Sequence, residues 1–146
     1  MGAPQIENRQ WTKAFRQNIG YLNGMRFTQD ASANVNVIRG YGPGELRIND
    51  TVFRTTMIVA STETRAAPSI TSAATLDSGH AAQLLELRPE VVLIGTGRRQ
   101  VFPAAAFGAQ FLEAGIGVEV MDTGAACRTF NVLVGEQRLA VALLIL

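Results

Sequence analysis

Cysteine and histidine are almost absent from this sequence, with one of each in 146 residues. Cys127 alone cannot form an internal disulfide, and His80 alone cannot supply a conventional set of zinc ligands. A disulfide scaffold and a structural metal site are therefore excluded, and we expect no cofactor. The low cysteine content favours a reducing compartment, either a bacterial cytoplasm or, as the alternative, the mitochondrial matrix.

Charge is also scarce. Charged residues make up 17% of the chain and the formal net charge is +1, whereas a typical soluble protein has about 25% charged residues. The basic residues are spread along the sequence, so no strong positive field attracts a polyanion. We expect no nucleic-acid partner.

Long apolar runs are missing as well. The longest apolar stretch, "LAVALLIL" at residues 139–146, is the length of a strand and falls short of the about 18 residues that span a bilayer. This predicts at most a peripheral membrane association. Apolar residues nevertheless make up 47% of the chain, which is enough to form the core of one globular domain.

Residues 1–33 form a segment that we treat separately from a domain at residues 34–146. Basic residues surround four apolar residues at helical spacing, namely Trp11, Phe15, Ile19 and Leu22. This pattern predicts a basic amphipathic helix. It is either a transit peptide or a helix that covers an apolar patch on this domain or on a partner.

The period of apolar residues changes to two from Asn34 onward. We predict a three-stranded antiparallel meander at residues 35–39, 45–48 and 51–60. Residues 61–76 are rich in Ser, Thr and Ala and show no convincing period. They predict a mobile loop or a lid.

The rest of the sequence alternates between helical and strand patterns. Asp77 or Ser78 can cap a first helix that Pro89 ends, and "VVLIG" at residues 91–95 has the continuous apolar character of a strand covered on both faces. The remaining expected elements are a helix from Pro103 to Gly115 with Phe107 and Phe111 inward, a strand at residues 117–122, a helix that Thr123 caps and that closes near Gly135, and a strand at residues 138–146. This order predicts an α/β fold with a mixed, mostly parallel sheet.

A glycine turn follows the predicted strand at residues 91–95. Gly95, Thr96 and Gly97 precede Arg98 and Arg99, at the edge of the sheet where α/β proteins place their sites. The arginines could hold a carboxylate or phosphate, or could be solvated. The glycines could serve only the turn.

A nucleotide site is one hypothesis for this turn. The dinucleotide pattern requires a third glycine where Gln100 stands and a helix that begins directly after it, whereas the predicted helix begins near Pro103. Asp122 closes the next strand at about the right distance for a ribose-binding acid, which keeps the hypothesis open.

A second turn, Asp122-Thr123-Gly124, is expected at the same edge, because parallel strands end on the same side of a sheet. Asp122 could instead be simply a helix cap. Arg128 and Asn131, on the helix that follows, are further candidates for a polar contact surface or for an exposed helix face.

Cys127 falls near the start of this helix, where the helix dipole would favour a thiolate nucleophile. Such a nucleophile needs a base, and His80 lies on another helix with nothing in the sequence to orient it. A small buried thiol is the simpler interpretation. We predict no catalytic residue.

Three segments together resemble a known family: "RGYGPGELRIN", "EVVLIGTGRRQ" and "GIGVEVMDTGAACRTFNVLVGE". The chain resembles a small family of largely uncharacterised bacterial and archaeal proteins whose mitochondrial member is a complex I assembly factor. The similarity covers residues 35–146 and is densest at residues 89–136. It implies a three-layer β+α/β fold around a mixed sheet, and an aliphatic residue can stand at the Cys127 position in this family.

The resemblance implies a non-enzymatic protein-binding role. Mitochondrial members bind subunits and another assembly factor, and bacterial members are often encoded near protein-export genes. We therefore expect a module, acting as a homodimer or heterodimer, that binds subunits or assembly factors of a membrane complex. The alternative is a binding protein for a nucleotide or another anion. In either case the site is expected at Gly95, Thr96, Gly97, Arg98, Arg99, Asp122, Thr123, Gly124, Arg128 and Asn131.

Overall fold

The computed structural model describes residues 35–146, so the amphipathic segment predicted at residues 1–33 lies outside the described residues. The strands are β1 (Ile38–Gly42), β2 (Glu45–Ile48), β3 (Thr51–Phe53), β4 (Met57–Val59), β5 (Thr64–Ala66), β6 (Val91–Gly95), β7 (Gly117–Met121) and β8 (Ala140–Leu144). The helices are the 3-10 helix η1 (Ala73–Thr75) and the α-helices α3 (Ser78–Leu85), α4 (Ala105–Glu113) and α5 (Thr123–Gly135).

The strands form two sheets. Strands β1, β2 and β3 make a three-stranded antiparallel sheet, and the central sheet has five strands in the order β5-β4-β8-β6-β7. Strand β6 pairs in parallel with both β7 and β8, whereas β4 pairs antiparallel with β8 and β5. The central sheet is therefore mixed, with its parallel half built by the helical crossovers that the sequence predicted.

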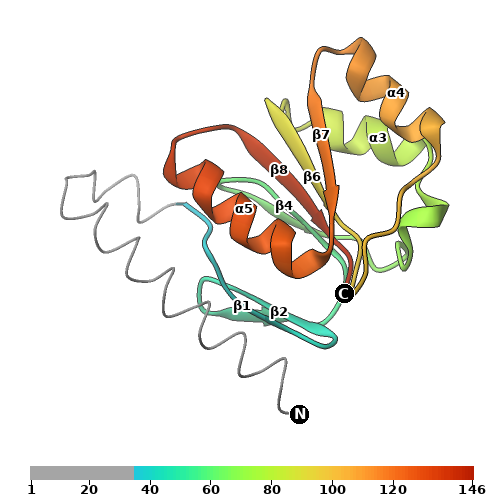
Figure 1. Ribbon diagram of the computed structural model, residues 1–146. Coiled ribbons are helices and arrows are strands. Elements are labelled where there is room, and N and C mark those ends of the chain that lie inside the picture. Colours follow the sequence, from blue (N-terminus) through green and yellow to red (C-terminus); the bar gives the residue numbers. More distant parts are fainter. Residues whose placement is uncertain (1–34) are drawn as a thin grey trace.

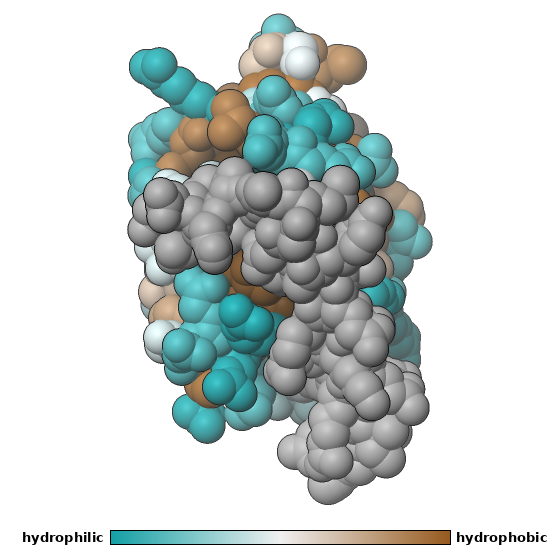
Figure 2. Space-filling view, turned by 90° about the vertical axis from the view of Figure 1, so that its left-hand side faces the viewer, coloured by the Kyte–Doolittle hydropathy of each residue, from teal (hydrophilic) through white to brown (hydrophobic). Residues whose placement is uncertain are grey.

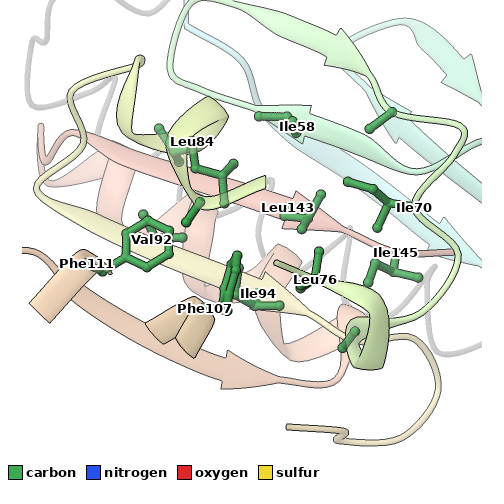
Figure 3. Packing of buried hydrophobic residues seen from close by; sticks show 14 residues of the cluster. Ile58, Ile70, Leu76, Leu84, Val92, Ile94, Phe107, Phe111, Leu143 and Ile145 are labelled. Atoms are coloured by element: carbon green, nitrogen blue, oxygen red, sulfur yellow. The ribbon is translucent and has the colours of Figure 1, made fainter. Parts of the chain in front are cut away.

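Helices cover both faces of the central sheet, which produces three layers (Figure 1). On one face, α3 and α4 pack on alternate residues of β6 and β8, and Figure 3 shows Phe107 and Phe111 lying against Val92 and Ile94. On the other face, α5 and the three-stranded sheet pack on Leu93 and its neighbours. The predicted three-layer α/β fold is confirmed.

The third predicted strand, at residues 51–60, is wrong as a single element. The chain leaves the sheet after Phe53, and β4 begins at Met57 in the central sheet. Thr56, at this transition, is buried and its hydroxyl donates to the Ile70 carbonyl at 2.7 Å. Residues 51–60 therefore connect the two sheets.

The prediction of a mobile loop or lid at residues 61–76 is also wrong. This segment contains β5, which pairs with β4, and the helix η1. Four of its side chains are buried in the core at intervals of three residues, namely Ala67, Ile70, Ala73 and Leu76. This burial fixes the segment against the face that α3 and α4 cover.

Two predicted helix starts are shifted. Helix α4 begins at Ala105, two residues after Pro103, because Ala104 keeps an extended backbone. Helix α5 is capped by Asp122, whose carboxylate accepts from the Ala125 N–H at 2.8 Å, so Thr123 is its first residue and not its cap. The cap of α3 is Asp77, one of the two residues that the sequence predicted for this role.

Candidate functional site

The turns that follow β6 and β7 meet at one edge of the central sheet and are joined by hydrogen bonds. The Thr96 N–H donates to the Met121 carbonyl at 2.9 Å, and the Thr123 N–H donates to the Gly97 carbonyl at 2.9 Å. In return, the Gly97 N–H donates to the Thr123 hydroxyl oxygen at 2.7 Å. The structure thus brings together two turns that lie about one βα unit apart in the sequence.

Thr123 also ties these turns to the end of the chain. Its fully buried hydroxyl donates to the Ile145 carbonyl at 2.6 Å, and the Ile145 N–H donates to the Gly95 carbonyl at 2.9 Å. The ends of β6, β7 and β8 converge around the C-terminus in Figure 1. Thr123 therefore connects the two turns to the residue that follows β8. Its hydroxyl is used in bonds within the protein and is not available to a ligand.

The presence of glycine at both positions of the first turn, Gly95 and Gly97, is explained by packing and backbone conformation. A Cβ on Gly95 would lie 3.0 Å from Thr123 Cα and 3.1 Å from Ala126 Cβ, so Gly95 allows α5 to approach β6 closely. Gly97 has a φ of +98°, a conformation that side chains disfavour. The glycines are thus required by the fold, whether or not a ligand binds.

The amides of both turns are largely used within the protein. Those of Thr96, Gly97 and Thr123 donate across the turns, and the Val101 N–H donates to the Thr96 hydroxyl at 3.0 Å. The Asp122 carboxylate holds the start of α5. A phosphate cradle needs free amides without a nearby carboxylate, so this geometry does not favour the nucleotide hypothesis.

Asn131 does not form part of an exposed contact surface. It is 4% exposed, and its side-chain amide makes two hydrogen bonds to Ile38 of β1. Its Oδ1 accepts from the Ile38 N–H at 2.9 Å and its Nδ2 donates to the Ile38 carbonyl at 2.8 Å. Asn131 therefore attaches the three-stranded sheet to α5, and its side chain is not available to a ligand or partner.

Cys127 is not an activated nucleophile. The residue is 1% exposed, and burial raises the pKa of its thiol, an effect that the nearby Arg128 only partly opposes. Its packing against the core outweighs the helix dipole from which the sequence suggested a thiolate. The Nδ1 of His80 accepts a hydrogen bond from the Asp77 N–H at 3.0 Å, so this histidine completes the α3 cap.

We predict that Cys127 reacts with iodoacetamide only when the protein unfolds. The expected labelling rate at pH 8 is on the order of 10³-fold lower in buffer than in urea, because thiolate formation requires exposure of the buried sulfur. Mass spectrometry of timed samples measures this rate, with Cys127→Ala as the blank. Equal rates in buffer and in urea would contradict the burial of this thiol.

The exposed members of the predicted site are Arg98, Arg99 and Arg128. A Cβ on Gly124 would lie 3.5 Å from the Tyr41 ring and 3.6 Å from Arg128 Nη1, so Tyr41 of β1 borders the site, which the sequence did not predict. Asp122 is half-buried beside them. The guanidinium groups of Arg98 and Arg99, after the first turn, and of Arg128, on α5, are therefore exposed around turns that bond to each other.

Two apolar residues next to these arginines were missed by the sequence interpretation. Val101 is 38% exposed and Phe102 is 68% exposed, in the segment that connects Gly97 to α4. The signal was the sequence "RRQVF", in which basic and apolar residues share a short segment without secondary structure. We call residues 98–102 the basic-apolar loop.

A cleft within the described residues opens elsewhere, between β5, the segment after it and α3. Its polar lining includes Arg65, His80 and Gln83. Arg65 is already paired with Glu63 at 2.7 Å and with Glu86 at 3.4 Å. No helix in residues 35–146 is both long and apolar enough to cross a membrane.

A family model described as "Protein of unknown function (DUF498/DUF598)" matches residues 38–145, from the first residue of β1 to the residue after β8. The chain belongs to the DUF498/DUF598 family. The match covers both sheets and the three α-helices of the described residues. The DUF498/DUF598 fold therefore includes the edge at which the two turns meet.

Curated relatives of this DUF498/DUF598 chain carry two kinds of name. NADH dehydrogenase (ubiquinone) 1 alpha subcomplex assembly factor 3 of Danio rerio is 37% identical over 118 residues, which cover 80% of this chain and 67% of that protein. The 13 kDa major membrane protein of Francisella tularensis is 38% identical over 63 residues, which cover 43% of this chain and 51% of that protein. The match thus spans about half the length of the Francisella relative.

Solved structures agree with the fold. A protein of Bordetella parapertussis superposes with a TM-score of 0.69 at 35% identity, over 76% of this chain and 95% of that one. A Bordetella pertussis protein described as a Mth938-like domain gives a TM-score of 0.70 at 28% identity, over 82% and 91% of the two chains. The resemblance predicted from the sequence is confirmed.

Proposed function

We propose that the protein is a binding module for subunits or assembly factors of a membrane protein complex. The observation that carries this proposal is the basic-apolar loop, in which Arg98 and Arg99 are exposed beside Val101 and Phe102. Exposed aromatic and arginine side chains are the residues that most often dominate protein interfaces. The assembly-factor names of the relatives support the same role.

The internal bonding of the neighbouring turns supports this choice over a small-molecule site. Gly97 and Thr123 bond to each other, and the Thr96 N–H donates to the Met121 carbonyl, which leaves the charge and apolar surface of the loop outside. A rigid support lowers the conformational entropy that a loop loses on binding. The compartment, bacterial cytoplasm or mitochondrial matrix, stays a prediction from the cysteine content.

We predict that Phe102→Ser weakens partner binding by about 2 kcal/mol, or roughly thirtyfold, as expected for a hot-spot aromatic residue. The stability of the fold should change by no more than about 0.5 kcal/mol, because the side chain is exposed. Tagged full-length protein purified from its host under mild solubilisation measures the binding. Respiratory or membrane-biogenesis subunits should accompany the wild type and be depleted from the variant.

Leu139→Ser is the matched control. Leu139 is 53% exposed and lies next to the start of β8, at the end of the sheet opposite to the two turns. Its replacement removes a similar apolar surface but should leave partner recovery unchanged. Consistent recovery of the wild type alone would contradict the proposed function.

A further inference from the structure

Strand β7 ends the central sheet on the side away from β5, and it leaves one row of backbone groups outside the sheet (Figure 1). Alternate residues of a strand direct their N–H and C=O groups to opposite sides. The Met121 carbonyl accepts from the Thr96 N–H, so Met121 and, by alternation, Glu119 face β6. Val118 and Val120 therefore direct their backbone groups outward.

One of these outward groups is already occupied by a side chain. The Gln100 amide donates through Nε2 to the Val120 carbonyl at 2.8 Å. This primary amide stands where the backbone N–H of a neighbouring strand would stand. Within residues 35–146, no described strand pairs with the outward side of β7, so Val118 and the N–H of Val120 keep their pairing capacity.

The surroundings of this edge suit an added strand. The side chains of Val118 and Val120 are half-buried against the core, which fixes the strand in the plane of the sheet. Leu112 of the adjoining α4 is 80% exposed, and Figure 2 shows hydrophobic residues interspersed with hydrophilic ones at the upper end of the molecule, where α4 and the start of β7 lie in Figure 1. Glu119, at the centre of β7, is exposed on the opposite face.

We propose that an extended segment of a partner protein pairs with the outward side of β7 and displaces the side chain of Gln100. Main-chain hydrogen bonds to Val118 and Val120 provide affinity, as in other cases of strand addition. A Lys or Arg of the segment lies opposite Glu119, because opposite charges on facing strands stabilise the pair. This inference rests on the proposed function and specifies how the partner is held.

A second copy of this chain fits the edge less well. Antiparallel self-pairing that sets Val118 opposite Val120 also sets Glu119 opposite its own counterpart, and like charges at facing positions are destabilising. A heterologous segment avoids the charge repulsion by carrying the opposite charge.

The decisive variant is Val118→Pro in the full chain. Proline removes the outward N–H and adds bulk at the pairing edge, yet it is tolerated on an edge strand whose N–H faces solvent. We expect the amount of co-purifying partner to fall about tenfold or more. Ala66→Pro is the matched control, because Ala66 lies on the opposite edge strand and its exposed N–H also faces outward, as the inward bond from Ala67 to Thr56 shows.

A second variant should gain binding, which loss of folding cannot imitate. Gln100→Ala frees the Val120 carbonyl, so partner affinity should rise by about two- to twelvefold, the worth of one hydrogen bond. Amide hydrogen exchange on the isolated wild-type complex provides the direct measurement. The amides of Val118 and Val120 should exchange rapidly in the free protein and become protected when the partner is bound.

The outcomes separate the two proposals. Wild type that recovers no partner overturns both, whereas equal partner recovery by the wild type and Val118→Pro overturns strand addition and leaves the proposed function standing. Binding that leaves the Val118 and Val120 amides unprotected also overturns strand addition. A wild-type homodimer in size-exclusion chromatography with light scattering that Val118→Pro dissociates would assign the edge to a second copy instead.

Discussion

Asn131→Leu is expected to lower the free energy of unfolding by about 2–6 kcal/mol. Leucine has a similar size but cannot bond to Ile38, whose N–H and C=O both pair with the Asn131 amide in a fully buried position. Each buried backbone group left without a partner costs about 1–3 kcal/mol. Urea denaturation, followed by circular dichroism, measures the loss.

The control places the same new residue one position further along α5. Val132 is 49% exposed, so Val132→Leu should change stability by no more than about 0.5 kcal/mol. Amide exchange at Ile38 adds a local readout, because loss of the amide pair should expose β1 before the rest of the domain. An unchanged unfolding energy for Asn131→Leu would mean that this amide does not attach β1 to α5.

A third variant distinguishes the two hydrogen bonds of Asn131. Asn131→Asp keeps an acceptor for the Ile38 N–H but, when ionised, offers no donor to the Ile38 carbonyl. Protonation of the aspartate side chain gives it an O–H group that can donate to the Ile38 carbonyl. The stability deficit of Asn131→Asp relative to the wild type should therefore shrink as the pH falls, whereas that of Asn131→Leu should not.

The elements that the sequence predicted well are those whose signal is local. The continuous apolar run of β6 reflects burial on both faces, since Val92 and Leu93 contact opposite layers. Phe107 and Phe111 are one helical turn apart, and their rings meet edge to face at 5.1 Å between centroids. Such spacing depends only on the period of the element that carries it.

The elements that the sequence misassigned depend on contacts between distant residues. Strand β4 looks like a continuation of β3, but Met57 pairs with Leu144, and the choice of sheet cannot be seen in either strand alone. The core contacts of the segment from Ala67 to Leu76 recur every three residues. That spacing matches neither period two nor the helical period, so the sequence pattern alone predicts a loop or a lid.

The candidate site likewise has one feature that the sequence predicts and one that depends on contacts between distant residues. The meeting of the two turns follows from a general rule for parallel strands, and their hydrogen bonds agree with it. The role of Asn131 does not follow from such a rule, because Ile38 lies 93 positions away in the sequence. A buried asparagine and an exposed one look alike until the fold supplies their neighbours.

Gly95→Ala is expected to destabilise the fold by about 1–3 kcal/mol, the usual cost of overpacking a core. The added methyl group would lie 3.0 Å from Thr123 Cα and 3.1 Å from the Thr123 hydroxyl oxygen. The Thr123 backbone cannot rotate away as a flexible side chain could, so α5 must move from β6. That movement stretches the bonds from Thr123 to Gly97 and Ile145.

Gly108→Ala makes the same chemical change with the opposite expected sign. Gly108 lies within α4 and a Cβ there meets no atom within 4 Å, so alanine should stabilise the helix by about 0.5–1 kcal/mol. Unfolding of both variants in urea compares a glycine required for close packing with one that is not. If Gly95→Ala were as stable as Gly108→Ala, α5 would not be held against β6, and the two turns would lack the rigid support on which the exposed basic-apolar loop depends.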